Sequence, residues 1–165
     1  MKKIKSNIKN YKNMIDSGKA DAMAFIRGGA DNKNLFGTAS FTQKLNGVLV
    51  TTEVFNLPAD QQYGGAFHGY HIHTGSRCIG NEQDEFADTG GHYNPKNYPH
   101  PYHAGDIPPL LSNNGYAYSS FLTSRFDVAD IIGRTVIIHA DADDFTTQPS
   151  GNSGKKIACG EIVKI

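Results

Sequence analysis

The chain has 165 residues, with 16 basic side chains, 16 acidic side chains, seven histidines and a formal net charge of zero. This length suits a single domain with its own hydrophobic core. The balanced charge and the absence of a basic stripe with interleaved aromatic residues argue against nucleic-acid binding, and no apolar run is long enough to span a bilayer.

Residues 1–18 form the one segment of biased composition. Its basic side chains are Lys2, Lys3, Lys5, Lys9 and Lys12. Apolar residues recur at helical spacing, at Ile4, Ile8, Tyr11 and Ile15. We expect a loosely ordered basic extension, rather than an amphipathic helix on an anionic surface, followed by one domain over residues 19–165. The segment lacks the apolar stretch and cleavage site of a secretory signal, so we expect a cytoplasmic protein.

From residue 19 onward, short runs of apolar or alternating residues separated by turn signals predict β-strands. The first three expected strands cover residues 22–28, 36–43 and 48–55, with Gly47 able to take the positive φ of a hairpin between the second and third. The fourth strand contains the sequence YHIH at residues 70–73. Residues 74–114 then show little apolar alternation, and loops of that length are usually functional.

Three more strands are expected over residues 115–122, 134–140 and 156–165, and residues 126–132 offer at most one helical turn. Many short strands of this kind favour an antiparallel sandwich or barrel.

Histidines gather around the long loop. His71 and His73 lie two residues apart on a strand, so both rings project from the same face. His139 ends a β-branched run, and His92 lies in a loop rich in Gly, Asn and Pro that can aim its ring. Imidazole donors with one carboxylate and no thiolate favour copper or zinc over magnesium or calcium.

Simpler interpretations exist for these residues. Any one histidine in a strand, taken alone, is more often an ordinary core or surface residue. His100 and His103 could form an adventitious zinc site on the surface.

Five segments, taken in order, carry a resemblance to a known family. They are GAFHGYHIHTGSRC, GGHYNP, HAGDIPPL, IIGRTVIIHADADD and SGNSGKKIACGEI. They resemble the signature segments of the copper/zinc superoxide dismutases, over roughly residues 20–165. The resemblance implies an all-β fold, an eight-stranded antiparallel Greek-key barrel of the immunoglobulin-like sandwich type with two long functional loops. It also implies conversion of superoxide to dioxygen and hydrogen peroxide by a histidine-bound copper ion.

The resemblance implies one copper and one zinc ion per chain. The implied copper ligands are His71, His73, His92 and His139. The implied zinc ligands are His92, His100, His103 and Asp106, with His92 bridging the two ions. Only two residues separate His100 from His103, fewer than in well-known family members, so zinc binding is expected to be less secure than copper binding.

Three further residues receive roles from the resemblance, and His92 receives an additional one. Asp143, preferred over Asp144, would link a copper histidine to a zinc histidine, and His68 would pack behind the copper ligands. His92 would also be a catalytic acid, because its ring takes up a proton when copper is reduced. Lys156 stands where the family has an arginine that guides superoxide. It keeps the charge but loses the planar fork, so we expect activity at a reduced rate unless Lys156 merely lies in a solvated loop.

Cys78 and Cys159 match a pair that the family joins by a disulfide, although a cytosolic location would favour two reduced, buried thiols. The expected substrate is superoxide, and the resemblance allows a homodimer without indicating its interface. Two other functions remain open. One is a non-enzymatic copper-binding or buffering module that lost fast turnover through Lys156, and the other is a copper-only dismutase whose shortened loop no longer encloses zinc.

Overall fold

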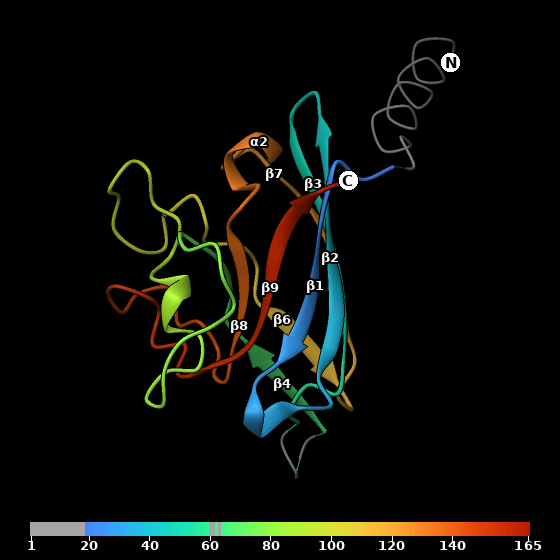
Figure 1. The fold of residues 1–165 in the computed structure, drawn as a ribbon, viewed down its shortest axis with the longest axis vertical. Helices are drawn as coiled ribbons and strands as arrows, with labels where there is room; N and C mark the ends of the chain where they lie inside the picture. Colours follow the sequence, from blue (N-terminus) through green and yellow to red (C-terminus); the bar gives the residue numbers. More distant parts are fainter. Residues whose placement is uncertain (1–18, 60–61, 63) are drawn as a thin grey trace, which may run out of the picture.

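The computed structural model describes residues 19–59, 62 and 64–165 (Figure 1). The basic extension expected over residues 1–18 lies outside these described residues. In the described part of the chain, no helix is long and apolar enough to cross a membrane.

Nearly all of the regular structure is β-strand. The strands are β1 (Ala22–Gly28), β2 (Phe36–Lys44), β3 (Gly47–Phe55), β4 (Gly65–His68), β5 (Tyr70–His73), β6 (Leu110–Asn113), β7 (Ala117–Thr123), β8 (Thr135–His139) and β9 (Lys156–Lys164). The helical turns are η1 (Ala30–Asn32), η2 (Ala87–Thr89) and α2 (Val128–Ile131). The single turn α2 lies within the region where the sequence allows at most one.

Seven strands form one antiparallel sheet in the order β5-β8-β9-β1-β2-β3-β7, and β4 pairs separately with β6. The sheet curls around the core, and the long loops gather beside β8 (Figure 1). The prediction of an all-β antiparallel fold with long loops is confirmed. The β2-β3 hairpin also has the expected geometry, because Gly47 takes a φ of 137° directly after the two-residue turn.

The strand expected around YHIH is divided into two at Gly69. The Gly69 amide donates to the carbonyl oxygen of Asp141, and its own carbonyl accepts from the His139 amide, both at 2.8 Å. A Cβ at position 69 would lie only 2.6 Å from Ser153 Oγ, so glycine allows this close approach. The chain therefore leaves β6 and joins β8 at this point. With β4 and β6, the described residues form nine strands, where the family resemblance implied eight.

A second difference is β6, which lies inside the stretch that the sequence predicted to be one continuous loop. It has only four residues and follows Pro108 and Pro109. Its pairing with β4, far away in sequence, makes it a strand. A run this short carries too little alternation to be recognised alone.

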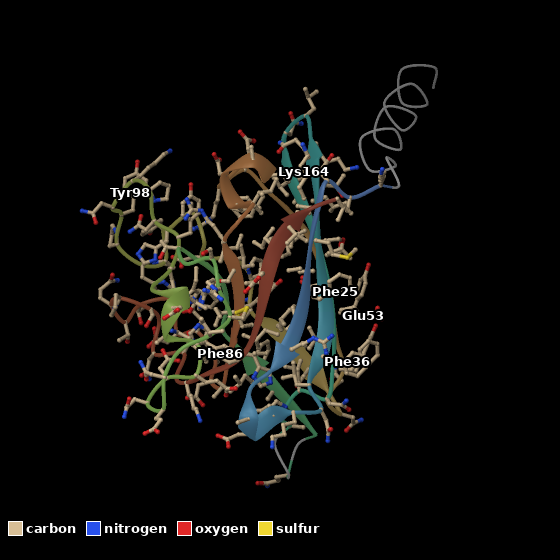
Figure 2. All side chains as sticks on the ribbon, in the orientation of Figure 1. Phe25, Phe36, Glu53, Phe86, Tyr98 and Lys164 are labelled. Atoms are coloured by element: carbon tan, nitrogen blue, oxygen red, sulfur yellow. A yellow bond between two sulfur atoms is a disulfide. The ribbon has the colours of Figure 1, made fainter. Side chains whose placement is uncertain are left out.

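The core and the loops cover opposite faces of β5 and β8. Both strands are buried at every residue. Tyr70 and Ile72 of β5 enter the hydrophobic core, so the alternating histidines of β5 face the loops instead. On the far side of the sheet, Phe25 of β1 points away from the loops and is 64% exposed (Figure 2). The fold thus presents the β5 histidines to the loop side only.

Candidate metal centre

The long loop runs along the free edge of β5. The backbone of Ile72 donates to the Gly105 carbonyl at 2.9 Å and accepts from the Tyr93 amide at 2.8 Å. As a result, two loop residues lie directly opposite two strand histidines: His92 opposite His73, and Asp106 opposite His71. Backbone pairing, rather than a mobile loop, therefore sets where these side chains point.

Four imidazoles from β5, β8 and the loop converge at one point, which we call the first group. Its members are His71, His73, His92 and His139. All four are buried, and one ligand atom from each lies within 4.8 Å of the others. Among the described residues, these four rings each have one buried nitrogen without a hydrogen-bond partner: His71 Nδ1, His73 Nε2, His92 Nε2 and His139 Nε2. Such atoms are costly to bury unless something binds them, so the group fits a metal ion.

Hydrogen bonds on the opposite side of the rings fix which nitrogen is free. His73 Nδ1 donates to the Gly90 carbonyl at 2.8 Å, and His139 Nδ1 donates to the Gly154 carbonyl at 3.1 Å. Because a carbonyl only accepts, each Nδ1 carries the proton and each Nε2 keeps a lone pair. That lone pair is the one that a metal ligand needs.

A second group lies beside the first and shares His92 with it. It consists of His92, His100, His103 and Asp106, all buried, with ligand atoms within 4.8 Å of one another. Asp106 lies close to the Nδ1 atom of each ring, at 2.7 Å from His92, 3.1 Å from His100 and 3.3 Å from His103. Three nitrogens and one carboxylate oxygen form a donor set that suits tetrahedral zinc. The shortened loop therefore still brings His100 and His103 together.

Asp143 connects the two groups. Its carboxylate accepts from His71 Nε2 at 2.7 Å and from His100 Nε2 at 2.9 Å. Asp144, the alternative considered from the sequence, instead accepts from the Thr147 hydroxyl at 2.6 Å on the exposed side of the loop. The structure thus gives Asp143 the contacts expected of a linking carboxylate.

Two other residues singled out in the sequence lie outside both groups. His68 is buried, with Nδ1 3.0 Å from the His139 carbonyl oxygen and Nε2 3.2 Å from that of Pro58. Lys156 lines a cavity of about 550 Å³ that also exposes His73 and His92. Lys156 is therefore part of the cavity wall and not of a solvated loop.

Two side chains that the sequence did not single out fasten the loop of the second group. Gln148 accepts from the His100 amide at 2.9 Å and donates to the His100 carbonyl at 2.7 Å. Arg125 donates to the carbonyls of Pro101 and His103, each at 2.8 Å. These contacts join residues at least 22 positions apart, so no local pattern indicates them.

Burial favours the uncharged form of three histidines of the first group, His71, His73 and His139. It lowers the pKa of His139 to about 3 and the pKa of His73 well below its usual value. It also lowers the pKa of His71, although the hydrogen bond to Asp143 opposes this. These three rings are therefore neutral at neutral pH, which is the form that binds a metal.

These shifts predict that the metal-free protein loses stability in acid. The unfolded His139 ring titrates near 6.5 and the folded ring near 3, so between these values the unfolded state binds more protons. The free energy of unfolding should therefore fall as the pH falls through this window. Urea unfolding across the window checks this, with His139→Gln as the control that should show a shallower slope. A urea unfolding midpoint that does not change with pH would contradict the lowered pKa of His139.

A disulfide between Cys78 and Cys159 joins the long loop to β9, as the family resemblance implies. The two Cα atoms are 5.6 Å apart, and Phe86 and Ile137 pack around the bond. Figure 2 shows Phe86 where the loop meets the sheet. The bond thereby ties this part of the loop to the sheet.

Replacing both cysteines with serine should lower the free energy of unfolding by about 4 kcal/mol, because the bond closes a long loop in the unfolded chain. The bonded residues are 81 positions apart. Chemical denaturation of the variant measures the loss, and reductant should bring the unaltered protein to the same value. Equal stability with and without the bond would refute this prediction.

Comparisons with known proteins agree with one another. The sequence model described as copper/zinc superoxide dismutase matches residues 35–162. A superoxide dismutase [Cu-Zn] of Deinococcus radiodurans is 34% identical over 142 residues, covering 75% of each chain. One of Legionella pneumophila is 37% identical over 134 residues, covering 76% of each chain. The matched region of the family model contains both groups of candidate ligands.

Solved structures show the same fold. A Cu/Zn superoxide dismutase from Brucella abortus aligns with a TM-score of 0.71 at 23% identity, over 85% of this chain and 98% of that chain. A SOD-like protein from Bacillus subtilis aligns with a TM-score of 0.68 at 28% identity, over 84% of this chain and 96% of that chain. A Cu/Zn superoxide dismutase and a SOD-like protein thus share this fold, so activity depends on the side chains of the site.

Proposed function

Because this chain belongs to the copper/zinc superoxide dismutase family, we propose that it converts superoxide to dioxygen and hydrogen peroxide at the site built by its two histidine groups. One observation carries the proposal: four buried ring nitrogens, with no hydrogen-bond partner among the described residues, face one common point. Bound there, a copper ion supplies the one-electron redox chemistry of the reaction.

The donor chemistry supports the assignment of each metal. His71, His73, His92 and His139 would hold copper, since four imidazoles suit that ion. His92, His100, His103 and Asp106 would hold zinc, and their complete donor set argues against a copper-only enzyme. The cavity beside the first group gives a small anion access to it, which argues against a closed copper store.

We assign proton transfer to His92. Its Nδ1 lies among the donors of the second group, 2.7 Å from Asp106 Oδ1, while its Nε2 faces the first group without a partner. Contacts at Nδ1 therefore keep the ring in place while Nε2 accepts and releases a proton. The ring also borders the cavity, so that the proton is held next to the path of the substrate.

Lys156 would attract the substrate anion to this cavity. Arginine at this position would keep the charge and add a planar set of donors, so Lys156→Arg should raise the rate per bound copper by about two- to fivefold. Pulse radiolysis at equal copper content measures the rate. Lys164→Arg, at the far end of β9, is the matched control and should change nothing. No gain from Lys156→Arg would count against its role as guide.

The proposed function is tested by loading the chain with copper and zinc and following the decay of superoxide. The decay rate should rise in proportion to bound copper. It should also fall as ionic strength is raised from about 10 mM to about 500 mM, because salt screens the attraction between cation and anion. A decay rate independent of bound copper would show that the chain is no dismutase.

A further inference from the structure

Lys156 is the cation that the proposed function places at the cavity, yet its ammonium group is already engaged. Lys156 Nζ donates to Asp84 Oδ2 at 2.7 Å and to the Phe86 carbonyl oxygen at 3.1 Å. The Lys156 side chain is only 15% exposed, whereas Asp84 is 40% exposed. The ammonium is thus fixed in position, and a carboxylate beside it cancels part of its charge.

Asp84 is itself held firmly by the turn in which it lies. Its amide donates to Asn81 Oδ1 at 3.0 Å, and its carbonyl accepts from the amides of Asn81 and Ala87 at 2.9 and 3.0 Å. Its carboxylate also accepts from the Phe86 amide at 3.0 Å. Burial acts to raise the pKa of Asp84, but the hydrogen bonds from Lys156 and Phe86 outweigh it and lower the pKa. The carboxylate is therefore ionised at neutral pH and can hold a cation.

Asp84 lines a cavity that would admit an anionic substrate, although its own side chain is negatively charged. Among the described residues that line the cavity, Asp84 supplies the only carboxylate. The neighbouring Glu85 points elsewhere, since its Oε2 accepts from the Ala30 amide at 2.7 Å. A fixed negative charge beside the entrance repels an anionic substrate and weakens the field of the lysine.

We propose that Asp84 is a positioning residue for Lys156, which holds the ammonium at the cavity wall and limits the positive field that draws in the substrate. The inference deepens the proposed function and rests on it for its effect on catalysis. The first part of the proposal, that Asp84 restrains Lys156, applies to the metal-free chain as well.

The restraint is tested first on metal-free protein by competitive acetylation of lysines with acetic anhydride, quantified by mass spectrometry. Lys164, exposed at the far end of β9, is the internal reference. Asp84→Ala should raise the labelling of Lys156 relative to Lys164 by about threefold, because it frees a paired amine. Glu85→Gln should leave the ratio unchanged. An unchanged ratio in Asp84→Ala would overturn the restraint.

The effect on the field is tested on the copper-loaded protein. Asp84→Asn keeps an oxygen acceptor for Lys156 but removes the negative charge, so the rate should rise about two- to fivefold at low ionic strength, with the gain lost at high salt. Glu85→Gln changes the net charge equally and should give a smaller gain. An equal gain in both variants, or none in Asp84→Asn, would overturn the proposal. If no copper-loaded form reacts with superoxide, the proposed function fails, while the labelling still decides whether Asp84 restrains Lys156.

Discussion

Replacing His71 and His139 together with glutamine will lower bound copper from about one ion per chain to less than about 0.1 and reduce dismutation to the uncatalysed rate. The two rings come from paired strands, β5 and β8, with centroids 5.0 Å apart. Each offers a buried nitrogen that has no hydrogen-bond partner in the part of the chain that the structure describes. Copper and zinc content by mass spectrometry of metals, together with the rate of superoxide decay, measures the result.

Glutamine is similar in size to histidine and keeps a polar group near Asp143 and the Gly154 carbonyl, so the double variant should fold. Zinc is the internal control, since neither substituted residue belongs to the second group. Zinc content near that of the unaltered chain would show that the site around His92 persists. A double variant that still dismutes superoxide at the original rate would refute the copper assignment.

The second large effect is expected at Asp143. Asp143→Ala removes the acceptor from both His71 and His100, and losing a carboxylate that orients metal ligands typically weakens metal binding by about 10- to 100-fold. Competition with a chromophoric chelator measures the zinc and copper dissociation constants. Asp143→Asn keeps one oxygen acceptor, so its zinc and copper affinities should fall less than those of Asp143→Ala.

Asp144→Ala is the matched control for this prediction. Asp144 is the adjacent carboxylate, but it is exposed and accepts only from Thr146 and Thr147 among the described residues. Its replacement should leave both metal affinities nearly unchanged. Equal losses of metal affinity in Asp143→Ala and Asp144→Ala would show that the Asp143 carboxylate does not act through the histidines.

Much of the site follows from local sequence rules. Alternation on a strand places His71 and His73 on one face, and a β-branched run places His139 at a strand end. The candidate ligands and the Cys78–Cys159 pair followed from the family resemblance, and the structure brings each of these sets together. Periodicity and ordered motifs carry this information because each is contained within a short stretch of chain.

The remaining features depend on contacts between distant parts of the chain. The division of a strand at Gly69 results from an approach to Ser153, and β6 exists because β4 lies beside it. The restraint of Lys156 by Asp84 joins residues 72 positions apart. No local pattern indicates such contacts, since tertiary packing decides them. The cytoplasmic location and the homodimer stay predictions.

The central claim is that two adjacent buried groups hold one copper and one zinc ion and that the copper site turns over superoxide. Titration of metal-free protein with both ions, with metal content and dismutation rate measured on the same samples, tests it most directly. We predict saturation at about one copper and one zinc per chain, with a rate proportional to copper occupancy. Copper bound at that ratio without any dismutation above the metal-free protein would contradict it.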